Sequence, residues 1–293
     1  MFSAQDVKTL REKTGAGMMD CKKALQETNG NMDDAITWLR EKGISKAAKK
    51  ATRIAAEGLT QASSMDNSAV ILEVNSETDF VAKNEEFKKL VSQIMNTLVN
   101  SNVKTIEEAN KLTLADSNET IEEAIINLTA KLGEKLSFRR FEIIKKTDSQ
   151  TFGIYSHMGG RITTLVVLEG ANEDVAKDVA MHAAAMRPQY LNPEEVPSEV
   201  LEKEKEIMKE QLLNEGKPEE RVEQILVGKV KKFYEEVCLE NQIFIKAENK
   251  ETVGKFIENN GGKLISMTRY EVGEGMEKRN ENFAEEVAKQ ING

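Results

Sequence analysis

The stretch GLTQASSMDNSAVILEVN, residues 58–75, marks the point at which the sequence changes from a helical to a strand-like pattern. Two extended runs, 58–64 and 69–75, flank residues 65–68, and the Asp-Asn pair among these four is typical of a tight turn. The stretch therefore predicts a β-hairpin. Because the residues before it carry helical signals, a new domain is expected to begin near residue 55.

Three short helices are predicted ahead of this hairpin. Residues 3–6 can form a capping box for the first helix, and the glycine-rich residues 14–17 end it. The second helix runs to residues 29–30. The third is capped by Asn31 and is expected to stop at Gly43.

The chain is acidic, with a formal net charge of −9, but its beginning is basic. Residues 1–55 hold 11 Lys or Arg against 7 Asp or Glu, a net +4, and the remainder holds 30 against 43, a net −13. The basic stretch 44–56 is predicted to be a tether behind the three helices. The overall acidity argues against a nucleic-acid-binding role, because such proteins usually need a basic excess to release counterions from phosphates.

Helix and strand signals alternate after the hairpin. Apolar residues between Phe87 and Leu98 recur at helical spacing. The five residues TIEEA occur at 105–109 and again at 120–124, and in each copy a Thr is followed three positions later by a Glu. This is the capping-box pattern, so two more helices are expected. Residues 135–144 return to strand character.

The next segment repeats the order of a hairpin and a following helix. A second hairpin is predicted over 151–168, with its turn at 158–160, and a helix over 173–186. At an offset of 94 residues the sequence VAK occurs twice, and two strand segments coincide. Such an offset suggests an internal duplication. The matching segments are 72–74 with 166–168, and 81–83 with 175–177.

The last part of the chain predicts a helical hairpin and the end of the core. Prolines at 188, 193 and 197 mark a boundary before it. Two helices joined at 216–218 are expected to form an antiparallel hairpin or a short coiled coil. The predicted elements are helices over 198–215, 219–237 and 252–259, a strand over 263–272 and a helical tail from Asn280.

Together these elements predict an α+β fold. It comprises an N-terminal three-helix domain, a core of two similar antiparallel α+β subdomains, an inserted antiparallel helical hairpin and a C-terminal helical module. The expected ranges are 1–54 for the partner-docking domain and its tether, 55–145 for the first core subdomain, 146–190 with 238–272 for the second, 191–237 for the helical hairpin and 273–293 for the C-terminal module.

The sequence predicts no catalytic centre. It contains no HExxH, GxSxG or GxxxxGK[ST] motif. Its two histidines fall on different elements: His182 is expected to be structural, and His157, beside a glycine turn, is expected to be exposed and able to contact a partner. Cys21 and Cys238 lie far apart without a His cluster, so neither a zinc site nor a disulfide framework is predicted. No cofactor or metal is expected.

The expected location is the cytoplasm. No apolar run approaches the roughly 20 residues that span a bilayer, so no membrane contact is predicted. Residues 1–6 lack the pattern of a signal or transit peptide.

Two groups of residues suggest contacts with a partner protein. Met18 and Met19 follow the glycines of the first interhelix loop, where methionine can serve either as core filler or as an adaptable binding surface. Phe80 can continue the buried helical face of Phe87, seven residues later, or project from a separate turn, since Asn84 looks like a new helix start. The pattern alone slightly favours burial of Phe80.

Three runs make the chain resemble the bacterial elongation factor Ts family. They are LREKTGAGMMDCKKAL at 10–25, ILEVNSETDFVAKN at 71–84 and YEVGEGMEK at 270–278. The similarity covers essentially the whole chain in the same order. One departure is Met276, where the family more often has Ile, and proteins tolerate this apolar exchange.

The resemblance implies a guanine-nucleotide exchange factor rather than an enzyme. Such a factor binds elongation factor Tu in its GDP-bound and nucleotide-free forms and promotes GDP release, so that GTP can bind. The resemblance assigns the disturbance of the partner's magnesium site to Thr78, Asp79, Phe80 and Val81. Phe80 would act as a wedge between partner helices, which reverses the preference for its burial.

The resemblance also implies further contact residues. Met18 and Met19, in a module similar to ubiquitin-associated domains, would hold the nucleotide-binding domain of elongation factor Tu. His157 would lie near a distal domain of the same partner.

Two other function classes fit the sequence less well. An RNA-associated factor that uses the basic stretch 44–56 would show salt-sensitive RNA retention, which the net charge disfavours. A coiled-coil scaffold would need sustained heptads, and only 198–237 approaches them. The sequence leaves the oligomeric state open, including a homodimer through the core or the helical hairpin.

Overall fold

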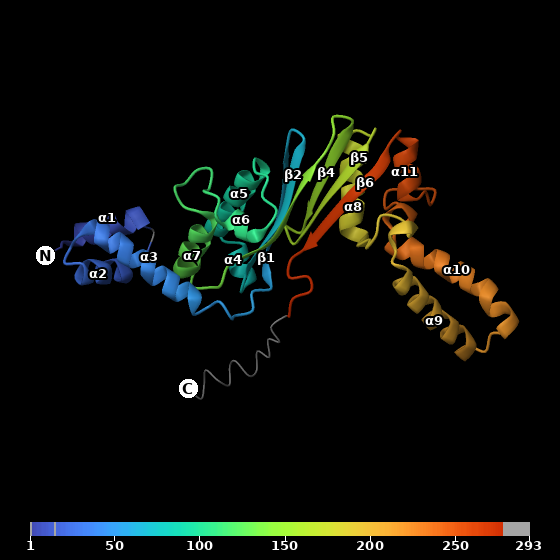
Figure 1. The fold of residues 1–293 in the computed structure, drawn as a ribbon, viewed down its shortest axis with the longest axis horizontal. Helices are drawn as coiled ribbons and strands as arrows, with labels where there is room; N and C mark the ends of the chain where they lie inside the picture. The colour runs from blue at the N-terminus through green and yellow to red at the C-terminus, as the bar shows by residue number, and fades with distance from the viewer. Residues whose placement is uncertain (1, 15, 278–293) are drawn as a thin grey trace. The chain divides into compact units, whose positions relative to one another are not determined.

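The N-terminal residues form three helices, α1 (Ala4–Thr14), α2 (Met18–Glu27) and α3 (Met32–Ala48), in a computed structural model that describes residues 2–14 and 16–277 (Figure 1). The predicted capping box is present, because the Ser3 amide donates to the Asp6 carboxylate and the Asp6 amide donates to Ser3 Oγ. Asn31 caps α3 through its side chain, as expected. The module has its own small core, whose fully buried members include Leu10, Cys21 and Leu25.

Helix α3 does not stop at Gly43, and this prediction was wrong. Gly43 is buried inside α3, where a Cβ at its position would lie 3.6 Å from Ala130 Cβ on helix α7 (Ile121–Leu132). Glycine disfavours helix by only about 1 kcal/mol relative to alanine, and packing on α7 outweighs that preference.

The basic residues after Gly43 are not a free tether either. Lys46 Nζ lies 2.8 Å from Asp20 Oδ2, and Lys50 Nζ donates to the Gly133 carbonyl oxygen at 2.7 Å. Arg53 pairs with Glu77 at 3.3 Å. Each of these cations is therefore bonded to another part of the protein.

The first hairpin belongs to a three-stranded sheet with the order β1-β2-β3. Its strands are β1 (Glu57–Met65), β2 (Ser68–Ser76) and β3 (Ser137–Lys145), and every residue of β2 is buried. Gly58 has φ +141°, and a Cβ there would lie 2.2 Å from the Val74 carbonyl oxygen, so only glycine fits this close approach. The predicted turn at 65–68 thus joins β1 to β2.

Four helices accompany this sheet in the sequence: α4 (Asp79–Ala82), α5 (Glu85–Val99), α6 (Ile106–Asn110) and α7. Both TIEEA capping boxes are confirmed, with Thr105 and Thr120 each accepting from the backbone of the Glu three positions later. Helix α5 buries the apolar face that begins at Phe87.

The second three-stranded sheet has the order β4-β5-β6, with β4 (Gln150–His157), β5 (Ile162–Glu169) and β6 (Lys263–Glu271). Strands β4 and β5 are antiparallel from Gln150 opposite Glu169 to His157 opposite Ile162. Helix α8 (Glu173–Met186) lies so close to β4 that a Cβ on Gly153 would come within 2.1 Å of the Ala176 carbonyl oxygen.

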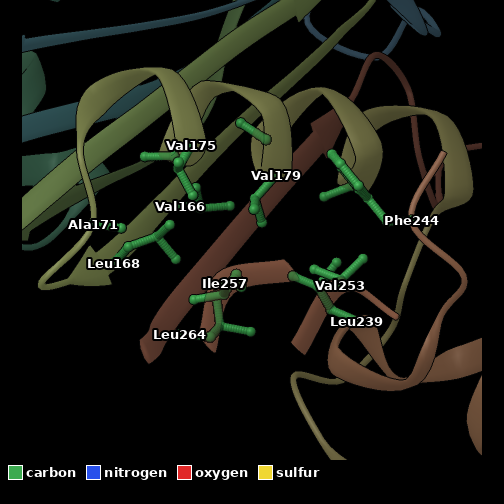
Figure 2. Close-up of a cluster of buried hydrophobic side chains, with 13 residues drawn as sticks. Val166, Leu168, Ala171, Val175, Val179, Leu239, Phe244, Val253, Ile257 and Leu264 are labelled. Carbon is green, nitrogen blue, oxygen red and sulfur yellow. The ribbon is translucent and has the colours of Figure 1, made fainter. Parts of the chain in front are cut away.

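The core of this part lies between α8, the sheet and helix α11 (Val253–Asn259). Figure 2 shows side chains from these elements pointing toward one another. Burial of this many aliphatic groups supplies most of the local stability. The labelled residues are Val166, Leu168, Ala171, Val175, Val179, Leu239, Phe244, Val253, Ile257 and Leu264.

The predicted helical hairpin is present as α9 (Ser198–Asn214) and α10 (Glu219–Val237), which pack on each other. Short 3-10 helices, η1 (Pro193–Glu195) and η2 (Leu239–Asn241), flank the pair. The buried residues of the two helices are Leu212, Val222 and Leu226. In Figure 1 the pair extends away from the sheet β4-β5-β6.

A buried carboxylate anchors the residues that follow β6. Glu73 accepts from Arg139 Nη1 at 3.0 Å, from Arg140 Nε at 2.6 Å and from the Gly273 amide at 2.8 Å. Its negative charge is thus compensated by two guanidinium groups. The helical tail predicted from Asn280 lies outside the described residues.

The chain divides into two compact units. Among the described residues, the first comprises 2–14, 16–61, 72–143 and 271–277, and the second comprises 62–71 and 144–270. The fold is α+β, with two small antiparallel sheets. The five domain ranges expected from the sequence stay a prediction.

The two sheets share one arrangement, in which a hairpin pairs through its second strand with a later third strand. The offset of 94 residues carries the first residue of β2 onto the first residue of β5, and the first residue of α4 onto that of α8. This correspondence supports the proposed duplication.

Candidate partner-binding site

Residues 78–81 lie on α4, a helix of 4 residues that directly follows the buried strand β2. Thr78 caps the helix, because its Oγ1 accepts from the Val81 amide at 3.3 Å. Asn84 then caps α5, with its Oδ1 accepting from the Glu86 amide at 2.8 Å. Two caps within seven residues break the helical path, so α4 is a separate turn.

A carboxylate from a distant part of the sequence holds Thr78. The Thr78 amide donates to Glu134 Oε2 at 3.0 Å, and Thr78 Oγ1 donates to Glu134 Oε1 at 2.8 Å. Ser76 Oγ donates to the Thr78 carbonyl oxygen at 2.9 Å. The start of α4 is thus fixed by three hydrogen bonds besides its own cap.

Glu77, which precedes Thr78, in turn accepts a hydrogen bond from the residue that follows Glu134. Glu77 accepts from the Lys135 amide at 2.6 Å and from Arg53 Nη1 at 3.3 Å. Residues 77–78 and 134–135 therefore exchange hydrogen bonds in both directions. We call this set of four residues the clamp.

Phe80 projects from this anchored turn. Its side chain is 81% exposed, the largest exposed fraction among the large apolar residues that the structure describes as exposed. Val81 is half-buried and Ala82 is buried, so α4 is attached through its far side. Phe80 therefore does not continue the buried face of Phe87, and the preference drawn from the local pattern was wrong.

Asp79 lies beside Phe80 on the exposed surface. Its Oδ2 is 2.6 Å from Lys83 Nζ, and its side chain is about half exposed. An accessible carboxylate next to an exposed aromatic ring combines a charge and an apolar group that a partner surface can contact.

Met18 and Met19 are exposed, at 54% and 74%, as the loop interpretation required. Their placement differs from the prediction, because they form the first turn of α2 rather than a loop. Gly17 precedes this turn with extended backbone geometry and starts the helix one residue before Met18. The two side chains therefore sit on a helix end, a more rigid base than a loop.

The histidines behave as the sequence predicted. His157 ends β4 and is exposed, with its Nδ1 3.4 Å from Tyr155 Oη. His182 is buried, and its Nδ1 accepts from the Ile245 amide at 3.1 Å while Nε2 lies 3.0 Å from Gln242 Oε1. Burial lowers the pKa of His182, and the Gln242 contact opposes part of this shift.

Both cysteines are buried and free. Burial raises the pKa of Cys21, and burial together with the charges of Glu194, Glu195 and Glu240 raises the pKa of Cys238 to about 11. Protonated, buried thiols are poor nucleophiles and poor metal ligands. Within residues 2–14 and 16–277, no group of three or more His, Cys, Asp and Glu side chains is arranged to hold a metal ion.

No helix in the described part of the chain is both long enough and apolar enough to pass through a bilayer.

The predicted contact residues thus belong to three separate elements. Met18 and Met19 lie on α2 and Phe80 on α4, both in the first unit, whereas His157 lies on β4 in the second. Sequence reasoning named Thr78 but missed the other three clamp residues, Glu77, Glu134 and Lys135. No local signal could have revealed the clamp, because Glu134 lies 56 residues from Thr78.

A comparison with protein families complements this geometry. The family model described as "Elongation factor TS" matches residues 77–274. The match begins at the clamp residue Glu77 and ends after β6, so it includes α4 and His157 and excludes Met18 and Met19.

Proposed function

Because the chain belongs to the elongation factor Ts family, whose members are nucleotide exchange factors of translation elongation, we propose that it binds elongation factor Tu·GDP and promotes GDP release. The nucleotide-free partner would then take up GTP. Exchange breaks no covalent bond of the nucleotide, so this function requires docking surfaces and no catalytic residue of the chain itself.

The observation that carries the proposal is the exposed Phe80 on an anchored helix. A phenylalanine ring in water adds no stability to the free protein, whereas burial of an aromatic ring against a partner is strongly favourable. The fixed turn beneath the ring lowers the conformational entropy lost on binding. Phe80 is thus suited to enter a gap between helices of the partner.

Magnesium links this docking to nucleotide release. In nucleotide-binding proteins Mg²⁺ is held by one or two protein groups and by phosphate oxygens. Insertion of Phe80, with Asp79 beside it, would move the elements that position those groups. Loss of the ion removes the largest local positive charge from the phosphates, and GDP affinity falls.

Other contact surfaces must contribute binding energy besides Phe80. Factor and GDP bind antagonistically, and this coupling is reciprocal. A ten-thousandfold shift needs about 5.5 kcal/mol of differential affinity, more than one aromatic wedge supplies. Met18 and Met19 on α2 are the proposed second contact and His157 the third. Their binding energy would offset the strain that Phe80 imposes on the magnesium site.

A role in RNA binding through residues 44–56 is less well supported. Lys46, Lys50 and Arg53 are each bonded within the protein, which reduces the positive charge available for phosphates. Together with the acidic net charge, these contacts favour a protein over a nucleic acid as the partner. The role of the family in translation supports the cytoplasm as the place of action.

The direct test is release of fluorescent GDP from purified bacterial elongation factor Tu. The full chain should accelerate release, and Phe80→Ala should slow the accelerated rate by at least tenfold, about the effect of losing a buried aromatic anchor. Val227→Ala removes another strongly exposed apolar side chain, on α10, and serves as the matched control. Equal rates for Phe80→Ala and the wild-type chain would refute the wedge.

A further inference from the structure

The turn between α7 and β3, residues Gly133–Lys135, is the structural support of α4. Glu134 provides the contact, with one carboxylate oxygen for the Thr78 amide at 3.0 Å and the other for the Thr78 hydroxyl at 2.8 Å. Hydrogen bonds to an ionised carboxylate are roughly twice as strong as those between neutral groups. Both bonds act on the residue that caps α4.

Helix α4 depends on such support because it is too short to be stable alone. Its 4 residues form one turn, and the first turn of a helix is its unfavourable nucleus. Of its three apolar side chains, Phe80 faces water, Val81 is half-buried, and the small Ala82 is buried. Little burial therefore holds the turn in place, and polar anchoring has to do so.

The corresponding helix in the second unit shows the contrast. At the offset of 94 residues, Asn172 takes the place of Thr78 and caps α8, which continues for 14 residues. Helix α8 buries seven residues, so packing along its length secures it. Helix α4 lacks that length, since Asn84 starts a new helix.

The supporting turn is itself held from the other side. Lys135 Nζ donates to the carbonyl oxygens of Ala51 and Arg53 at 2.7 and 3.0 Å. Lys50 Nζ donates to the Gly133 carbonyl oxygen. The chain segment that leaves α3 therefore fixes the turn that carries the Glu134 carboxylate.

From this geometry we propose that Glu134 is a positioning residue for nucleotide exchange, which holds α4 through Thr78 and so directs Phe80 toward the partner. The inference rests on the proposed function, and it assigns to Glu134 no contact with the partner. Without Glu134, α4 is expected to fray in the free protein while the other docking surfaces stay intact.

The first experiment compares Glu134→Ala with the wild-type full-length chain. Amide hydrogens of residues 79–83 should exchange at least tenfold faster, because the loss of one charged hydrogen bond already predicts about this factor and Glu134 makes two. The maximal rate of GDP release from elongation factor Tu should fall in proportion to the ordered fraction of α4 that hydrogen exchange gives for Glu134→Ala, because only this fraction is competent. The factor concentration at half-maximal rate should change little.

Two further variants exclude a general loss of stability. Glu107→Ala, an exposed glutamate of α6 in the same unit, should leave both measurements unchanged. Glu134→Gln keeps one oxygen that can accept from a single Thr78 donor, so its GDP-release rate should fall between those of the wild type and Glu134→Ala. A Glu134→Gln variant no better than Glu134→Ala would argue against the hydrogen bonds as the cause.

A double-mutant cycle decides whether Glu134 acts through Phe80. If it does, Glu134→Ala should add no further loss of GDP release in the Phe80→Ala background. An equal loss in both backgrounds would overturn the proposal. If Phe80→Ala alone has no effect, the proposed wedge fails, and the inference on Glu134 is then decided by hydrogen exchange: unchanged exchange of residues 79–83 in Glu134→Ala overturns it.

Discussion

Phe80 and Phe87 show how differently one residue type contributes to folding within a single segment. Phe87 is fully buried in the face of α5, whereas Phe80 is 81% exposed one short helix earlier. Burial of a phenylalanine side chain contributes about 1.5–3 kcal/mol, and Phe80 forgoes nearly all of this. Its exposure is what the proposed contact with a partner requires.

This difference predicts opposite effects of truncation on stability. Phe80→Ala should change the free energy of unfolding by less than about 0.5 kcal/mol, because no cavity opens. Phe87→Ala should cost about 3–5 kcal/mol, because it empties a buried site. Urea unfolding of both variants measures the contrast. A Phe80→Ala protein that melts far below the wild type would place the ring in a core and remove the wedge.

His182 is a buried histidine whose two nitrogens have assigned roles. Because Nδ1 accepts from the Ile245 amide, the proton is assigned to Nε2, which donates to Gln242 Oε1. Gln242 Nε2 in turn donates to the carbonyl oxygens of Met186 and Glu236. Protonation of His182 would break the bond to Ile245, so the network requires the neutral ring.

The lowered pKa of His182 predicts acid sensitivity of the second unit. The unfolded state takes up a proton near pH 6.5 and the folded state only at lower pH, so the stabilisation is complete above pH 6.5 and declines as the pH falls below it. The free energy of unfolding should then change by up to about 1.4 kcal/mol per pH unit, the slope for one extra proton bound by the unfolded state.

Urea titrations between pH 7.5 and 5 can measure this slope, with His157→Ala as the exposed control. Burial raises the pKa of Glu240, which has the opposite effect on acidification, so the comparison should be made against His182→Leu. This variant should lose the histidine component of the pH dependence. Parallel pH profiles for the wild type and His182→Leu would contradict the assignment.

The helices α9 and α10 form an element that depends little on the rest of the second unit. Their buried residues are Leu212, Val222 and Leu226, and most of their other residues are exposed or half-buried. The end of α10 is joined to the core: the amides of Gln189 and Tyr190 donate to the Val237 carbonyl oxygen, and Gln242 Nε2 donates to the Glu236 carbonyl oxygen. The boundary of a removable hairpin therefore lies before residue 236.

Replacement of residues 200–232 by a Gly/Ser linker of about ten residues should leave GDP release within roughly twofold of the wild-type rate. Thermal melting followed by circular dichroism should show the second unit still folding cooperatively. The matched variant extends the replacement through residue 237 and removes the Val237 carbonyl contacts. If the shorter replacement already unfolds the unit, the hairpin is part of its core.

At the scale of the whole molecule, the segment after α3 couples the N-terminal helices to the clamp. Lys50 and Arg53 contact Gly133 and Glu77, so a truncation can remove the module with or without these contacts. The buried cluster of α1–α3 is separate from the cores that contain the two sheets, and its loss should leave those cores folded.

Two truncations can distinguish the loss of the Met18 and Met19 contacts from the loss of the support that holds Phe80 in place. A chain that begins at Lys50 lacks Met18 and Met19 but keeps the clamp, and its affinity for nucleotide-free elongation factor Tu should fall by about tenfold or more, as expected for lost anchor residues. A chain that begins at Ala55 also loses Arg53, and its maximal rate of GDP release should fall further. Full affinity of the shorter chains, measured by calorimetry, would remove the module from the interface.

The boundaries of most elements could be predicted because their signals are local. The Thr caps at 105 and 120, the Asn caps at 31 and 84, and the turn at 65–68 involve groups within a few residues of each other, and the structure contains all of them. A cap or a turn is satisfied by its own neighbours, so its sequence pattern carries nearly all of the information. The runs 71–84 and 270–278 likewise indicated the family.

Contacts between residues far apart in the sequence determine where α3 ends and how Phe80 is placed, which the sequence did not predict. Packing on α7 carries α3 through Gly43, and the clamp between residues 77–78 and 134–135 turns Phe80 into an exposed side chain on a fixed helix. Glycine tends to end a helix, and phenylalanine tends to be buried. Stronger tertiary interactions can override both preferences. Here the competing partners lie dozens of positions away, and folding alone brings them together.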